Sequence, residues 1–330
     1  MTALPEAEPH LAEDEAERVF GAILDGAVAE DEIARFLVAL SDRGETADEI
    51  AGAARALRAR LLPIDAPENA IDVCGTGGDG HHTLNVSTAV SLVVAAAGVP
   101  VAKHGNRAAS SKAGAADTLE ALGLDMDAAG RTAEKSLSEI GICFLFAKNH
   151  HPAMGRIQPI RQRLGRRTIF NLMGPLSNPA GVRRQLIGIA RPAYVPIYAE
   201  AKARLGSERT LIVSGDEGLD ELSLAGGNEV ADVEGHEWEM RRAHASDAGL
   251  PTAPIEAIRG GDAAHNAKAL RALLMGAPGP YRDAVLFNAG ASLMIAGRAG
   301  DYAEGAGIAA ESLDSGRAEA LLARWIEIAR

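Results

Sequence analysis

The chain has 330 residues, of which 47% are hydrophobic, 4% aromatic and 24% charged, and its formal net charge at pH 7 is −12. This length and apolar content are enough for a packed core and exclude an intrinsically disordered chain. The negative net charge disfavours binding to nucleic acid or to an anionic membrane, because like charges repel.

The N-terminus is acidic and lacks the apolar run of a secretory signal. The most apolar stretch, residues 89–102, is too short to span a bilayer, so we expect a cytoplasmic protein without a membrane anchor. Cys74 and Cys143 lie in apolar runs without the spacing of a metal or redox motif, so we expect buried core thiols.

The first part of the chain predicts helices only. Apolar residues recur at the i, i+3, i+4 spacing of an amphipathic helix over residues 15–24, 31–40 and 47–61. Thr46 followed by Glu49 predicts a capping box at the start of the third helix. Prolines then end the pattern, so we predict a small helical domain over residues 1–67.

From residue 70 onward, short apolar runs alternate with helical stretches. The predicted strands are residues 71–74, 99–102, 143–146, 185–189 and 210–213. The predicted helices are residues 86–97, 118–122, 131–140, 194–205, 263–274, 281–296 and 317–328. This alternation indicates that residues 68–330 form a larger α/β domain with a central, mostly parallel sheet flanked by helices on both faces.

Acidic residues are absent from two long stretches, residues 80–116 and 140–199, and both contain several lysines and arginines. Either these segments form a solvated basic face, or they surround an anionic ligand beside which a carboxylate would be costly. The second alternative gains support from residues 215–221, where four carboxylates follow a predicted strand. Such a cluster repels itself unless it holds a hard cation such as Mg²⁺, which bridges to substrate phosphates.

A glycine-rich loop, residues 75–80, follows the first predicted strand. Glycines leave backbone N–H groups open to a phosphate, and Asn85, the predicted N-cap, Ser87 and Thr88 then start a helix whose free amides favour anions. The loop has neither the Walker A lysine nor the dinucleotide spacing. The basic segment 103–111 ends the next strand, so a parallel sheet would bring both loops to one carboxyl edge.

Six motifs in this order resemble the anthranilate phosphoribosyltransferases of tryptophan biosynthesis. They are GTGGDG (75–80), NVST (85–88), KHGNRAASS (103–111), HPAM (151–154), RTIFNLMGPLSNPAG (167–181) and GLDELS (218–223). The resemblance implies a helical domain joined to the α/β domain through residues near 160–182, and a homodimer. It also implies Mg²⁺-dependent transfer of the 5-phosphoribosyl group from phosphoribosyl diphosphate to the amine of anthranilate, the second step from chorismate.

The resemblance assigns three sets of site residues by position. For phosphoribosyl diphosphate it implies Gly75, Gly78, Asp79, Thr83, Asn85, Val86, Ser87, Thr88, Lys103, His104, Gly105, Asn106, Arg107, Ala108, Ala109, Ser110, Ser111 and Ala115. For anthranilate it implies Gly75, Asn106, Arg161 and, at the entrance, His151. For two Mg²⁺ ions it implies Ser87 with Glu221, and Asp220 with Glu221. Residues 112–117 depart from the family's KSGSAD, because Ala115 has no hydroxyl to offer the ligand.

The reaction builds positive charge on the ribose and negative charge on the departing diphosphate. We expect Lys103, Mg²⁺ and helix amides to stabilise the diphosphate, with Lys103, Asn106 and Arg161 as the catalytic set. Arg161 suits a bidentate clamp on the anthranilate carboxylate. Since the aromatic amine is weakly basic, positioning should matter more than deprotonation, and we expect no obligatory general base.

Other interpretations of these residues remain open at this stage. A pyrimidine nucleoside phosphorylase shares the fold, but its basic loop would read more like KTSGRG, and a nucleic-acid-binding relative would use residues 148–191 against an unfavourable net charge. Several residues have a structural alternative to a ligand role: a polar turn at His81-His82, solvated turn residues at Asp216-Glu217, and helix-end anchors at Arg166-Arg167 and Arg183-Arg184.

Overall fold

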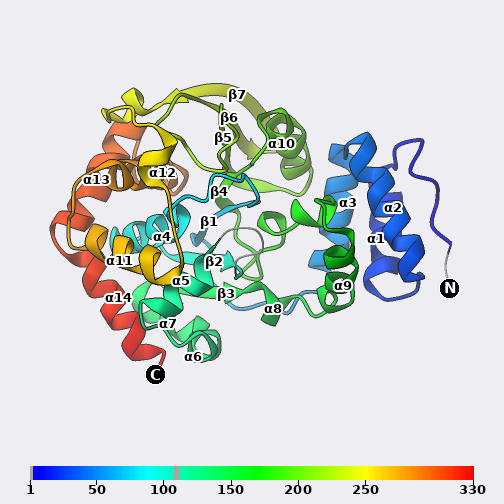
Figure 1. Cartoon of the computed structure of the whole chain (residues 1–330), viewed down its shortest axis with the longest axis horizontal. Coiled ribbons are helices and arrows are strands. Elements are labelled where there is room, and N and C mark those ends of the chain that lie inside the picture. The colour runs from blue at the N-terminus through cyan, green and yellow to red at the C-terminus, as the bar shows by residue number, and fades with distance from the viewer. Residues whose placement is uncertain (1–2, 108–111) are drawn as a thin grey trace.

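A computed structural model of the chain describes residues 3–107 and 112–330 (Figure 1). Four of the residues assigned to phosphoribosyl diphosphate, Ala108, Ala109, Ser110 and Ser111, lie outside the described part of the chain. Within that part, no helix combines the length and the apolar content that crossing a bilayer requires.

The N-terminal part is a bundle of three helices, α1 (Glu13–Leu24), α2 (Glu30–Arg43) and α3 (Ala47–Arg58). The predicted capping box is confirmed, because Thr46 Oγ1 accepts from the Glu49 N–H at 3.3 Å and Glu49 Oε2 accepts from the Thr46 N–H at 2.9 Å. A further helix, α9 (Met154–Leu164), lies against α1 and α2 (Figure 1) and shares their apolar core. It was not predicted, because Pro159 and several polar residues obscure its helical period.

The larger part is built on a seven-stranded sheet with the strand order β3-β2-β1-β4-β5-β6-β7. The strands are β1 (Ile71–Gly75), β2 (Val101–Gly105), β3 (Ile142–Phe146), β4 (Arg184–Gly188), β5 (Ser207–Gly215), β6 (Gly227–Gly235) and β7 (Glu237–His244). The first five are parallel and correspond to the predicted strands, whereas β6 and β7 add an antiparallel hairpin at one edge. The hairpin was not predicted, because β7 is mostly exposed and charged and has no apolar run.

Helices cover both faces of this sheet, as predicted. Alternate strand residues enter different cores: Leu186 belongs to the core with α4 (Val86–Ala96) and α12 (Pro280–Ile295), and Ile187 to the core with α10 (Val195–Arg204). The remaining helices are α5 (Ala115–Ala121), α6 (Met126–Arg131), α7 (Ala133–Ile140), α8 (Ala147–His150), α11 (Ala263–Leu274), α13 (Tyr302–Asp314) and α14 (Arg317–Ile328). Helix α13, which is rich in alanine and glycine, was not predicted.

Candidate active site

The glycine-rich loop after β1 contacts one of the two acids that follow β5. Gly77 and Gly78 have φ angles of +68° and +75°, in the left-handed region that favours glycine. The Gly77 N–H donates to Asp220 Oδ2 at 2.7 Å. A Cβ added to Gly75 would lie 2.2 Å from the same oxygen, so the close approach of loop and acid requires glycine there.

The second acid, Glu221, joins the loop to the basic segment after β2. Its Oε1 accepts from the Ser87 N–H, at the start of α4, at 3.0 Å. Lys103 is 3% exposed, and its Nζ donates to Ser87 Oγ at 3.3 Å and to the Val73 carbonyl at 2.7 Å. The loop, the lysine and the acid pair, which lie far apart in the sequence, therefore meet at the carboxyl edge of the sheet.

The charges of this cluster are poorly compensated within the protein itself. Burial, and then the nearby Asp79 carboxylate, raise the pKa of Asp220 to about 7. Burial, and then Asp220, raise the pKa of Glu221 well above its usual range. Burial lowers the pKa of Lys103, although Asp72 and Glu221 oppose that shift. An arrangement that brings two half-buried acids together favours a bound cation.

The oxygen donors of the cluster fit Mg²⁺. Among the described residues, Glu221 Oε2 is buried without a hydrogen-bond partner, while Glu221 Oε1 accepts from the Ser87 N–H, whose residue also carries the hydroxyl Oγ. Across the described residues, no three His, Cys, Asp or Glu side chains form a metal cage made by the protein alone. Mg²⁺ normally binds through one or two carboxylates, with water and substrate phosphates as its other ligands, so an incomplete protein set is what it uses.

Two residues that sequence reasoning missed hold the acid pair in place. Asn288, buried in α12, accepts from the Leu222 N–H and donates to the Leu222 carbonyl, both at 2.9 Å. A Cβ added to Gly188 would lie 1.6 Å from the Asp220 carbonyl oxygen. The turn between β5 and β6 that carries the acid pair, here called the acid turn, therefore packs directly on the β4 backbone. A lone asparagine in an apolar helix and a glycine inside a strand are the signals that point to them.

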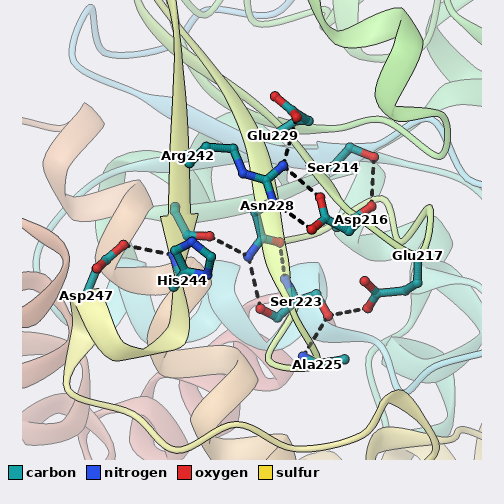
Figure 2. Close-up of polar contacts among 12 residues, drawn as sticks. Ser214, Asp216, Glu217, Ser223, Ala225, Asn228, Glu229, Arg242, His244 and Asp247 are labelled. Atoms are coloured by element: carbon teal, nitrogen blue, oxygen red, sulfur yellow. Dashed lines mark hydrogen bonds and ion pairs between the residues drawn. The ribbon is translucent and has the colours of Figure 1, made fainter.

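Asp216 and Glu217 are engaged elsewhere and are not available to a metal (Figure 2). Arg242, from β7, donates to both Asp216 carboxylate oxygens at 2.7 and 2.6 Å and to Glu229 at 2.8 Å. Glu217 accepts from the Ser223 hydroxyl. Both acids are therefore turn residues, as one of the two alternatives had it, but they are not simply solvated: Asp216 joins the turn to the β6–β7 hairpin, and Glu217 bonds Ser223 within the turn.

Asn85 occupies the predicted N-cap position of α4, but its side chain does not cap the helix. Its Oδ1 accepts from Thr118 Oγ1 at 2.6 Å and from Asn266 Nδ2 at 2.9 Å, which ties α4 to α5 and α11. Thr83, earlier in the same loop, pairs through its backbone with Arg259. In the first turn of α4, the Val86 N–H donates to the Leu84 carbonyl at 2.8 Å and the Ser87 N–H donates to Glu221, so only part of this turn is left for other partners.

The described part of the basic segment after β2 is only partly free to bind an anion. Arg107 forms ion pairs with Asp117 at 2.9 Å and Glu120 at 2.7 Å, so acids of α5 balance its charge. Asn106 is exposed and its Oδ1 accepts the Arg107 N–H. Ala115 begins α5 beside Gly105, since a Cβ on that glycine would lie 3.6 Å from the Ala115 methyl group.

The second acid-free stretch does not surround one ligand as a whole, and that expectation is wrong for several of its arginines. Arg156 donates to the Asp25 carbonyl at 2.8 Å, Arg163 pairs with Glu30 at 3.4 Å, and Arg166 pairs with Asp42. These arginines contact residues in or next to the acidic helices α1 and α2. Because α1 and α2 are far from the arginines in the sequence, the charge pattern did not reveal these contacts. Arg184 donates to the Ala296 carbonyl at the end of α12, as a helix-end anchor should.

Arg161, in the last turn of α9, differs from these neighbours. Its guanidinium is half-buried and makes no hydrogen bond or ion pair with any residue that the structure describes. Burial lowers its pKa, which measures the cost of keeping an uncompensated charge there. A carboxylate ligand would remove that cost and match the planar fork of the guanidinium.

His151 and His104 form a buried pair whose rings meet at their Nε2 atoms. The Nε2 atoms are 3.2 Å apart, and His104 Nδ1 lies 3.1 Å from the Gly174 carbonyl. Because that carbonyl can only accept, we assign the His104 proton to Nδ1, so that in the neutral pair His151 Nε2 donates to His104 Nε2. The other nitrogen, His151 Nδ1, is buried without a hydrogen-bond partner among the described residues, and the Ser177 backbone lies beside the ring.

Burial lowers the pKa of His104 to about 4 and that of His151 to about 3. Above the ordinary histidine pKa, both histidines are neutral in the folded and in the unfolded chain, so they do not make the free energy of unfolding depend on pH. Below that pKa the unfolded chain binds protons whereas the folded pair stays neutral. The free energy of unfolding should therefore fall by about 1 kcal/mol per pH unit for each histidine. Urea unfolding between pH 7 and pH 5 measures this slope.

The matched comparison for this prediction is His104→Gln against His265→Gln, since His265 is exposed on α11. His104→Gln should reduce the slope of the free energy of unfolding against pH below pH 7, whereas His265→Gln should leave that slope unchanged. Equal slopes in the two variants would show that the buried pair does not exclude protons.

Both parts of the chain match known protein families. Residues 6–61 match the model of the glycosyl transferase family helical bundle domain, and residues 67–319 match that of the glycosyl transferase family a/b domain. Anthranilate phosphoribosyltransferase of Erythrobacter litoralis is 79% identical over 329 residues, with all of both chains covered, and that of Novosphingobium aromaticivorans is 73% identical over 326 residues, with 99% of both covered.

Solved structures agree with these relatives. The crystal structure of anthranilate phosphoribosyltransferase from Thermus thermophilus superposes with a TM-score of 0.92 at 45% identity, covering 97% of this chain and 96% of that one. The Saccharomyces cerevisiae enzyme in complex with PRPP and Mg superposes with a TM-score of 0.87 at 29% identity, covering 97% of this chain and 94% of that one.

Proposed function

The chain belongs to the anthranilate phosphoribosyltransferases, and from this premise we propose which of its residues carry out each part of the reaction. The enzyme transfers the 5-phosphoribosyl group of phosphoribosyl diphosphate to the anthranilate amine, giving N-(5-phosphoribosyl)anthranilate and diphosphate. The observation that carries the residue assignment is the convergence of the glycine loop, Lys103 and the acid pair through the Gly77–Asp220, Ser87–Glu221 and Lys103–Ser87 contacts.

The acid pair is proposed as the magnesium site, with Ser87 and Glu221 for one ion and Asp220 and Glu221 for a second. The yeast relative bound to PRPP and Mg supports the metal, and the unpartnered Glu221 Oε2 supports its place. When bound, Mg²⁺ supplies positive charge that neutralises the diphosphate as it leaves. Asn288 and Gly188 keep the two carboxylates at the edge of the sheet, so no reorganisation is needed during the reaction.

The glycine loop and the start of α4 are proposed to hold the diphosphate. The left-handed glycines expose backbone amides, and the helix dipole adds partial positive charge at the Ser87 turn. Lys103 lies one hydrogen bond from Ser87 and adds a full charge that its burial keeps unscreened. Gly75, Gly78, Asp79, Thr83 and the residues from Lys103 to Arg107 complete the proposed binding set.

Anthranilate is proposed to bind through its carboxylate to Arg161, which has no partner among the described residues, with Asn106 and Gly75 beside it and His151 at the entrance. We therefore assign rate enhancement to positioning of the amine and to stabilisation of the leaving diphosphate, without an obligatory general base.

The direct test is the loss of anthranilate fluorescence on mixing with phosphoribosyl diphosphate. We expect turnover with Mg²⁺ and a fall of at least about a hundredfold after the metal is removed with a chelator, because two buried carboxylates would then face the diphosphate. Returning Mg²⁺ should restore the rate. Phosphorolysis of thymidine or uridine serves as the comparison, and turnover of those nucleosides instead of anthranilate would favour a nucleoside phosphorylase.

We further propose that the enzyme works in the cytoplasm as a homodimer that associates through its helical part. The family membership supports both the dimer and the compartment. Sedimentation of the purified full chain tests the dimer, since a single species of monomer mass across the working concentration range would contradict it.

A further inference from the structure

The segment between α9 and β4 carries a side chain that reaches the glycine loop. Arg167 Nη1 donates to the Gly77 carbonyl at 2.7 Å and to the Gly78 carbonyl at 3.2 Å. A Cβ added to Gly78 would lie 2.6 Å from the same nitrogen, so the guanidinium packs directly on the loop backbone. The expectation that Arg167 anchors a helix end is therefore wrong, because its partners are loop carbonyls.

These two hydrogen bonds determine where the loop amides point. In a trans peptide the C=O and the following N–H point in opposite directions, so carbonyls turned toward Arg167 turn the N–H groups of Gly78 and Asp79 away from it. Within the described residues, neither of these N–H groups has a hydrogen-bond partner in the protein. Gly77 is also fixed from its other side, because its own N–H is bound by Asp220.

Arg167 forms no ion pair with a carboxylate among the described residues, although Asp220, Glu45 and Asp79 lie near enough to favour its charge. Burial, followed by the neighbouring Arg191, nevertheless lowers its pKa. The loop therefore lies between a cation that no directly bonded carboxylate neutralises and the acid pair, with its free amides directed toward a ligand.

The same residue is joined to the helical bundle. Its carbonyl accepts from Ser41 Oγ, on α2, at 3.0 Å. Arg161, on α9, lies six residues earlier in a helix that packs on α1 and α2. A cavity lined by Ser41, Glu45, Arg167, Thr168, Arg191 and Tyr194 lies at this junction of the two parts.

We propose that Arg167 is a positioning residue that aims the Gly78 and Asp79 amides at the diphosphate and couples this alignment to the seating of the α9 segment. Because that segment also carries Arg161, occupancy of the anthranilate carboxylate site should tighten the binding of phosphoribosyl diphosphate, and the reverse. The inference rests on the proposed roles of the glycine loop and of Arg161.

The test compares Arg167→Ala and Arg167→Lys with Arg166→Ala, a matched control whose ion pair with Asp42 is exposed. Arg167→Ala should raise KM for phosphoribosyl diphosphate about 10- to 100-fold, the effect of losing charge-assisted bonds, with a smaller change in KM for anthranilate. The KM of Arg167→Lys for phosphoribosyl diphosphate should lie between those of the unmodified enzyme and Arg167→Ala. Guanidinium ion added to Arg167→Ala should restore part of the affinity for phosphoribosyl diphosphate. Arg166→Ala should behave as the unmodified enzyme.

Coupling is measured by calorimetric titration of phosphoribosyl diphosphate with Mg²⁺, with and without benzoate, which has the carboxylate but no amine. Benzoate should tighten this binding in the unmodified enzyme and in Arg166→Ala, but not in either Arg167 variant. An unchanged KM for phosphoribosyl diphosphate in both Arg167 variants, or an equal benzoate effect in all proteins, would overturn the inference. Failure of the proposed function is separate, since the unmodified chain would then show no turnover of anthranilate.

Discussion

Glu221→Gln is expected to lower kcat/KM by about a thousandfold while leaving the fold intact, because the amide removes a charged metal ligand but keeps its size. The substituted side chain retains an oxygen that accepts the Ser87 N–H, as Glu221 Oε1 does at 3.0 Å. It also relieves the cost of burying two neighbouring acids, so thermal stability without Mg²⁺ should stay equal or rise.

The matched control is Glu217→Gln, which changes an acid in the same turn that bonds Ser223 instead of facing Glu221. The control should keep its Mg²⁺ dependence, and any effect should appear as a loss of stability. Titration of activity with Mg²⁺ separates the two variants. If Glu221→Gln retained full activity at the same Mg²⁺ concentration, the acid pair would not be the metal site.

Arg161→Ala is expected to raise KM for anthranilate by about a hundredfold, because a bidentate charge-assisted pair would be lost from a half-buried site. KM for phosphoribosyl diphosphate should change much less at saturating anthranilate. Arg161→Lys should recover only part of the loss, since an ammonium lacks the planar fork that matches a carboxylate.

Arg163→Ala is the control for this change, because Arg163 is also in the last turn of α9 but pairs with Glu30 on the surface. Its KM for both substrates should stay within about twofold of the unmodified enzyme, as exposed ion pairs contribute little. Steady-state kinetics with each substrate varied in turn gives all the values. Equal increases in both Michaelis constants for Arg161→Ala would contradict its assignment to anthranilate.

The arrangement of the acid turn explains why both variants can be tested without unfolding the protein. Asn288 bonds Leu222 at one end of the turn. The Arg242–Asp216 pair holds the other end (Figure 2), so neither substitution touches the groups that hold the turn. The carboxylates themselves add charge but little packing, and Arg161 makes no bond within the described chain. Function and stability are thus assigned to different side chains.

The chain's alternation of apolar runs and helical periods was sufficient to predict the helical domain, the five parallel strands and the helices on both faces of the sheet. The glycine loop, Lys103 and the acid pair were also predicted to meet, because each follows a strand and parallel strands place their carboxyl ends at one edge. These features are local: the periodicity and the motif are complete within a few neighbouring residues.

Contacts between distant segments determined the rest, and no local pattern encodes them. The charge map could not distinguish Arg161, which has no partner among the described residues, from Arg163, which an acid more than a hundred residues away neutralises. Nor could a motif indicate that Arg167 binds the loop carbonyls or that Asn288 supports the acid turn. The sequence alone therefore determined which segments carry the chemistry, whereas tertiary packing decided which charges stay uncompensated, since that depends on what each side chain meets in space.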